Sequence, residues 1–231
     1  MKKNYMKYGK RVKHLVIILL LVSVNSCKRP SCDCIYAQKD QQYSDAYLLL
    51  IQKALFHYIG DFQITKEEIL LDSAIMQLNE AIELEPLNCS AYQYKAMALY
   101  WKKEYNEVIE VVDVVLSKNC EVPDLVFLKA RMYDIMGDSE NANVTLAFAE
   151  QIYDNWLKCY PDSIALQTAR IGCVAYAHGK DVAIRELDEL IKKYPGNQII
   201  EGCKEELENQ FKVSWFNREG CQAYEKYNNE W

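Results

Sequence analysis

The sequence predicts an all-α protein in which antiparallel helix pairs stack into a solenoid. A recurrence at 34 residues, the length of a helix-turn-helix repeat, is the first observation behind this prediction. From residue 46 onward, apolar side chains also recur at spacings of three and four, which is typical of amphipathic helices. Prolines and glycines stand between the periodic segments, where helices end. The recurrence relates Ala96 to Ala130, Leu99 to Tyr133, Lys103 to Gly137 and Val108 to Ala142.

The first 26 residues differ from the rest of the chain. Six Lys and Arg precede an apolar run, Leu15 to Val24, which indicates a secretory signal peptide. This run of ten residues is shorter than the roughly 20 residues of a membrane-spanning helix. Residues 24–27, Val-Asn-Ser-Cys, resemble the lipobox of bacterial lipoproteins. The resemblance implies cleavage before Cys27 and lipid attachment to it, with an ordinary signal peptide and a coincidental cysteine as the alternative.

The charge of the remaining chain argues against nucleic acid as a partner. Removing residues 1–26 takes away six of the 27 Lys and Arg and none of the 33 Asp and Glu, which leaves a net charge of about −12. A phosphate-binding surface needs clustered Lys and Arg, and only isolated basic pairs are present. Residues 27–42 are polar without periodicity, so we expect a flexible tether between a membrane anchor and the folded part.

Helices are expected to fill the rest of the chain. Pro86, Pro123, Pro161 and Pro195 mark helix ends or starts, and single glycines separate other segments. The predicted helices cover residues 43–59, 66–85, 89–102, 105–118, 123–136, 139–159, 162–178, 180–194, 197–213 and 217–229.

Residues 74–88, which close with Pro86 and Asn88, resemble the second helix and the end of the tetratricopeptide repeat. Further copies of the motif follow in residues 91–115, 124–150 and 183–197. The resemblance covers roughly residues 45–197. It implies a right-handed α-solenoid of about four repeats over residues 43–197, closed by a C-terminal helical cap over residues 198–231.

The chain departs from the family pattern in two respects. Residues 60–67 are expected as an insertion between the first two helices. Lys95 and Lys129 stand where the family usually has Leu, so the packing must differ there or the lysine stems must extend along the apolar surface to reach water.

Candidates for catalysis and metal binding are few. After removal of the signal only His57 and His178 remain, each near a predicted helix end and without a nucleophile or acid at a recognisable spacing. Cys32 and Cys34 lie close together, but no CxxC pair or nearby His completes a tetrahedral metal set. We therefore expect no enzyme activity, no cofactor and no metal, and a hydrolase with an unrecognised site is the enzymatic alternative.

Eight cysteines follow Cys27, an even number that permits disulfides in an exported chain. Cys89 begins the first helix of one expected repeat and Cys120 follows its second helix. These ends are neighbours in an antiparallel hairpin, so a Cys89–Cys120 disulfide is one interpretation and two buried thiols are the other.

The resemblance to tetratricopeptide repeats also implies a binding surface, because the first helix of each repeat lines the concave groove of that family. Aromatic and Arg side chains commonly dominate binding energy at interfaces. The alternative is that Tyr100 and Trp101 pack between repeats. The candidate partner-binding residues are Gln93, Met97, Tyr100, Trp101, Phe127, Arg131, Asp134 and Tyr176.

The resemblance therefore implies a non-enzymatic lipoprotein scaffold of the bacterial cell envelope that binds a protein or peptide partner. The lipid anchor would hold it to the membrane, facing the periplasm, with the outer membrane favoured over the inner. A glycan-binding or nutrient-uptake accessory lipoprotein and a component of outer-membrane β-barrel assembly are the alternatives.

Overall fold

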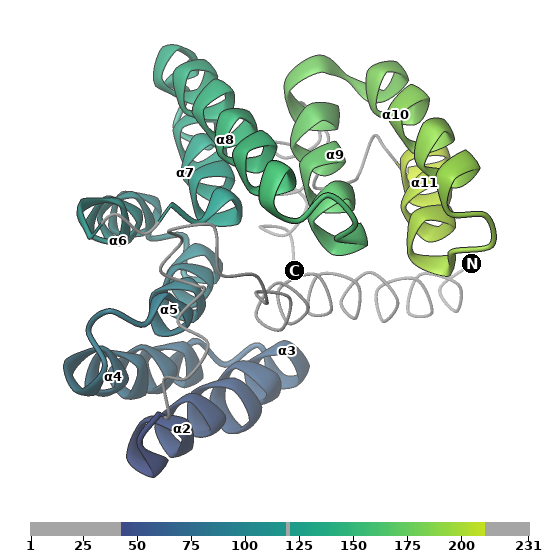
Figure 1. The fold of residues 1–231 in the computed structure, drawn as a ribbon. Helices are drawn as coiled ribbons and strands as arrows, with labels where there is room; N and C mark the ends of the chain where they lie inside the picture. Colours follow the sequence, from purple (N-terminus) through teal and green to yellow (C-terminus); the bar gives the residue numbers. More distant parts are fainter. Residues whose placement is uncertain (1–42, 119–120, 211–231) are drawn as a thin grey trace, which may run out of the picture. The chain divides into compact units, whose positions relative to one another are not determined.

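The computed structural model describes residues 43–118 and 121–210. Every regular element in these two ranges is a helix, which confirms the all-α prediction for them (Figure 1). The chain divides within α8 into two compact units, whose described parts are residues 43–152 and 153–210. The elements are α2 (Asp45–Gln52), η3 (Lys53–Ile59), α3 (Gly60–Thr65), α4 (Glu68–Leu84), α5 (Cys89–Trp101), α6 (Tyr105–Ser117), α7 (Pro123–Ile135), α8 (Ser139–Cys159), α9 (Ile164–His178), α10 (Lys180–Lys193) and α11 (Gln198–Gln210).

The predicted helix bounds from α4 to α10 agree with the structure within two residues. The long α8 begins and ends where the sequence places it, with the Asp138 carboxylate accepting a hydrogen bond of 3.1 Å from the backbone N–H of Asn141 in its first turn. Pro123 is the first residue of α7, where its missing N–H costs nothing. The predicted helix over residues 217–229 lies outside the described residues.

The expected insertion at residues 60–67 is wrong for most of its length. Gly60 has helical dihedrals, and α2, η3 and α3 form one continuous helical stretch that ends at Lys66, whose φ is +65°. Its middle part is a π-helix, in which the N–H of Gly60 donates to the carbonyl of Leu55 five residues earlier. Phe62 packs against the hydrophobic core, so tertiary contact offsets the poor helix propensity of Gly60.

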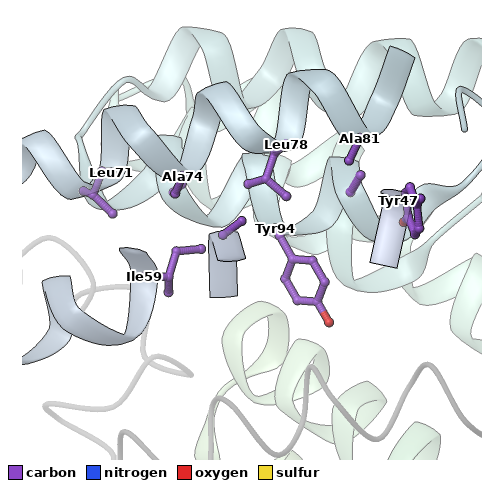
Figure 2. Packing of buried hydrophobic residues seen from close by; sticks show 10 residues of the cluster. Tyr47, Ile59, Leu71, Ala74, Leu78, Ala81 and Tyr94 are labelled. Atoms are coloured by element: carbon purple, nitrogen blue, oxygen red, sulfur yellow. The ribbon is translucent and has the colours of Figure 1, made fainter. Parts of the chain in front are cut away.

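The core of the unit formed by residues 43–152 begins between this first stretch and α4. Leu71, Ala74, Leu78 and Ala81 lie along one face of α4 and point toward the first stretch and α5 (Figure 2). Each of these four side chains is fully buried. Along the chain, α4 packs on α5, α5 on α6 and α6 on α7. Small residues on the inner faces let the helix backbones approach closely.

The 34-residue recurrence reappears in backbone geometry at the turns after α5 and α7. In the first turn, the N–H of Lys103 donates to the carbonyl of Tyr100 at 2.9 Å and the N–H of Glu104 to that of Leu99 at 3.0 Å. In the second turn, the bonds Gly137 to Asp134 (3.0 Å) and Asp138 to Tyr133 (2.8 Å) join the equivalent positions. Lys103 and Gly137 both have left-handed dihedrals, with φ of +63° and +83°. Different residues thus adopt one turn conformation.

A second turn conformation recurs after α4, α8 and α10, each time with a proline at its second position. Glu85 and Tyr194, the first residues of two of these turns, have nearly identical dihedrals, with φ of −132° and −129° and ψ of 70° and 68°. In all three turns the N–H of the last residue donates to the carbonyl of the first, and the side chain of the last residue accepts from the next helix. The three turns comprise residues 85–88, 160–163 and 194–197.

The unit that contains residues 153–210 has its own core, made by α9, α10 and α11. Ala183 and Leu187 of α10 are fully buried between Ile171 of α9 and Ile200 of α11. Only these two side chains of α10 are buried, which makes this helix an amphipathic one with a broad solvent-exposed face.

An ion pair between neighbouring helices also recurs. A basic residue on one helix reaches a carboxylate 16 residues earlier on the preceding helix. The side chain of Lys129 follows this pattern and is only 13% exposed, so its stem is covered while its ammonium finds a carboxylate, as expected for a lysine at an apolar position. The pairs are Lys129–Asp113, Arg170–Asp154 (2.6 Å) and Lys204–Asp188 (2.6 Å).

Candidate partner-binding surface

The eight residues predicted for partner binding lie on α5, α7 and α9, and most of them are buried. Gln93 is 6% exposed, Tyr100 and Arg131 are each 5% exposed, and Asp134 and Tyr176 are each 3% exposed. The remaining three, Met97, Trp101 and Phe127, are partly exposed. A side chain with this little accessible surface offers a partner almost no area, so the partly exposed residues are the ones available for a first contact.

Arg131 is the centre of a small cluster on α5 and α7. Its guanidinium carbon lies 5.9 Å from the ring centroid of Tyr100 and 5.9 Å from that of Phe127. Arginine binds aromatic faces at this distance through the ring quadrupole and through planar stacking. The contact with Tyr100 joins α7 to α5, and Phe127 lies one turn before Arg131 on the same helix. The cluster therefore stabilises the helix pair in addition to any role in binding.

Trp101 and Met97 belong to the packing of the first unit. Both pack against the core cluster between the first helical stretch and α4, and the Trp101 ring lies 5.9 Å from that of Phe62. Tyr100 has an aromatic neighbour in Tyr105, at 6.3 Å. The alternative that Tyr100 and Trp101 pack inside the protein is thus confirmed as a structural role, while their contact with a partner stays a prediction.

The position of α5 explains why so many of these residues are buried. Nine of its 13 residues are buried, and they point in all directions around the helix. Such a pattern is typical of a helix enclosed by neighbours rather than of an amphipathic surface helix. The sequence gives little sign of this, because Tyr, Gln and Trp occupy positions that a helix at an open surface could equally carry.

The end of α5 is fixed by Lys102, directly after Trp101. The ammonium of Lys102 lies 2.7 Å from a carboxylate oxygen of Asp72 on α4 and 2.6 Å from one of Glu104. Hydrogen bonds to Asp72 and Glu104 raise the pKa of Lys102 above its ordinary value. The lysine stays charged through the physiological range and connects α4 to the turn after α5.

The candidate catalytic histidines lie on exposed positions of two helices. His57 lies within the π-helical segment rather than near a helix end, because the helix continues to Thr65. His178 is the last residue of α9. Among residues 43–118 and 121–210, no group of three or more His, Cys, Asp or Glu is placed to hold a metal ion. Cys32 and Cys34 lie outside these ranges.

Cysteines of the described chain fall into two classes. Cys89 and Cys159 are disulfide-bonded, whereas Cys173 and Cys203 are buried thiols. Burial raises the pKa of Cys203 to about 12. Cys120 lies outside the described residues, so the Cys89–Cys120 pairing stays a prediction. The candidate lipidation site, Cys27, also lies outside them.

The sequence analysis missed the outward side chains of the first helical stretch. Leu48, Leu49 and Phe56 are 49%, 50% and 70% exposed, next to the exposed Lys53 and His57. The signal that could have found them is composition, because residues 46–60 contain no Asp or Glu and are mostly apolar. An amphipathic helix that buries only one face does not need apolar residues all round.

No helix within the described part of the chain is both long and apolar enough to cross a membrane. No family model matches the chain, and no curated protein matches it.

Proposed function

We propose that this chain is an exported, lipid-anchored scaffold with tetratricopeptide-like repeats, which binds a protein or peptide partner in the bacterial envelope. The observation that carries the proposal is the recurrence of turn conformation at 34 residues, from Ala98–Glu104 to Met132–Asp138. Helix pairs joined by equivalent turns stack in equivalent ways, and stacked pairs form extended surfaces that serve mainly for binding.

The proline turns add to this support. Residues 160–163 and 194–197 are again 34 residues apart, and they share hydrogen bonds with residues 85–88. The step from the first of these turns to the second is longer, which agrees with the extended α8. A family-like solenoid tolerates such a longer helix, since each repeat contacts only its neighbours.

Binding would begin at the partly exposed side chains of α5 and α7. Trp101 and Phe127 are large aromatics with accessible surface, and Arg131 lies behind Phe127. A partner that covers these rings gains apolar contact area and leaves the buried Arg131 charge paired with its aromatic neighbours. The proposed anchor, Cys27, keeps the scaffold at the membrane where such a partner would be met.

The test is site-specific photo-cross-linking in cells. Benzoylphenylalanine is placed at position 127 or 101 of the full chain, and at Val144 as a control. Val144 is 66% exposed and lies on α8, a second helix of its pair, where the groove of a tetratricopeptide-like solenoid would not be. The expected result is a discrete protein adduct from positions 127 and 101 and none from position 144.

Absence of any protein adduct from positions 127 and 101, or equal adducts from position 144, would refute partner binding by this face. The anchor is tested separately by metabolic palmitate labelling of the wild type and of Cys27→Ala. Equal labelling of the two chains would remove the lipoprotein part of the proposal and leave the scaffold part to stand on cross-linking alone.

A further inference from the structure

The first helical stretch has an apolar outer face that the unit itself does not cover. We define the outer face as Leu48, Leu49, Gln52, Lys53, Phe56 and His57, all of which are exposed. Leu48, Gln52 and Phe56 are spaced by four and lie on one side of the helix. The opposite side, with Tyr47, Ala54 and Ile59, is buried in the core next to α4. This stretch, the first of its unit, therefore presents its outer face away from that core (Figure 1).

The last described helix, α11, shows what an ordinary terminal helix looks like. It buries Ile200, Cys203 and Leu207 and exposes Glu201, Glu205 and Glu208. Terminal helices of stacked folds need such a polar outer face to stay soluble. The first stretch instead exposes two leucines and a phenylalanine. An apolar surface of this kind indicates contact with another apolar body.

The charge of the outer face narrows the choice of that body. Residues 46–60 contain no Asp or Glu, although the whole chain has 33 of them, and the exposed Lys53 and His57 flank the apolar side chains. Apolar side chains beside basic ones are the composition of helices that lie at a lipid surface, where the cations meet anionic headgroups. A second copy docked on the same face would bring Lys53 against Lys53 with no carboxylate from residues 46–60.

The length of chain before the outer face points the same way. We propose that the outer face lies on the lipid bilayer, in the boundary between headgroups and acyl chains. The inference rests on the proposed lipid anchor at Cys27, which precedes Tyr43 by 16 residues. A flexible segment of that length has a root-mean-square reach of roughly 20–24 Å, so the bilayer is always within range.

Tyr43 fits this orientation. It is 37% exposed at the start of the stretch, and its ring lies 5.3 Å from that of the buried Tyr47. Tyrosine is enriched at the membrane–water interface, because its ring is apolar and its hydroxyl stays hydrated. The outer face and Tyr43 would thus fix how the anchored protein stands on the membrane.

The experiment is photo-cross-linking to lipid with the full chain in cells. Benzoylphenylalanine replaces Phe56, or Gln52 in a second variant, and Val144 serves as the matched exposed apolar control on α8. Mass spectrometry then quantifies peptides that carry a phospholipid. We expect about tenfold or more phospholipid adduct at positions 56 and 52 than at 144.

A protein adduct at position 56, whether with a second copy of the chain or with another protein, would overturn the inference. Equal phospholipid adducts at positions 56 and 144 would overturn it as well. Palmitate labelling of the same samples separates this failure from failure of the anchor. Labelled protein without phospholipid adducts at position 56 refutes the lipid face alone, whereas unlabelled protein refutes the anchor.

Discussion

The equivalence of Lys103 and Gly137 leads to a quantitative prediction about the energy of the repeated turn. Both residues have left-handed dihedrals, and both donate the same backbone hydrogen bond. A Cβ at Gly137 would meet no atom within 4 Å, so a substitution there changes conformational energy without steric clash. The change from Gly to Ala should therefore cost the same at the two positions.

The magnitude follows from two opposing effects. A left-handed conformation costs a residue with a Cβ roughly 1–2 kcal/mol relative to glycine. Alanine recovers about 0.4–1 kcal/mol, because it restricts the unfolded chain more than glycine does. We thus expect Gly137→Ala to destabilise the protein by about 1 kcal/mol, and Lys103→Gly to be more stable than Lys103→Ala by about the same amount.

Urea unfolding followed by circular dichroism measures both differences. The Lys103→Ala variant removes the side-chain contacts of the lysine from the comparison, so that only the backbone effect remains. Gly202→Ala is the matched control, since Gly202 is inside α11 and its Cβ would also meet nothing within 4 Å. This control should stabilise by about 0.5–1 kcal/mol. If alanine stabilised the protein at position 137, or if the two turns differed in sign, the equivalence of the turns would be refuted.

Three further predictions concern packing, ion pairs and pH. Ala130→Leu should destabilise by about 1–3 kcal/mol in thermal unfolding, because Ala130 is fully buried, and an unchanged melting temperature would contradict the predicted helix crossing. Arg170→Met should cost about 1 kcal/mol at low salt and less at high salt, since it breaks partly exposed pairs with Asp154 and Glu186; a salt-independent loss would indicate packing instead. The raised pKa of Cys203 leaves its thiol neutral when folded while the unfolded thiol ionises above pH 9, so stability is retained below that pH and falls toward pH 12. Cys203→Ala should therefore lose about 1 kcal/mol less than the wild type between pH 8 and pH 10, and parallel losses would refute the raised pKa.

Local signals predicted most of the fold. Pro123 at the start of α7 and Asp138 before α8 are strong boundary signals, and the corresponding helix ends agree with the structure. The failure at Gly60 has a tertiary cause. A glycine within a helical pattern reads as a break, yet Phe62 packs against the core and its ring lies near that of Trp101, so the helix continues.

The candidate binding surface was predicted less well, for a reason that concerns residue type. Tyr, Trp and Arg dominate binding interfaces, but they are equally suited to the enclosed face of a helix when their polar atoms find neighbours. Tyr100 and Arg131 provide such neighbours for each other. Sequence periodicity locates them on one face of α5 and α7, but it cannot distinguish a face that meets a partner from one that meets the next helix.

The two surfaces proposed here are independent, and this separates their functions experimentally. The outer face lies on the first helical stretch, whereas Trp101 and Phe127 lie on α5 and α7. If the outer face holds the protein on the bilayer, replacing Leu48 and Phe56 by serine should lower lipid contact and leave the protein adduct at position 127 unchanged. Loss of the adduct at position 127 in that variant would mean that partner binding requires the membrane orientation. The membrane would then act as part of the binding site, because it limits the directions from which a partner can approach.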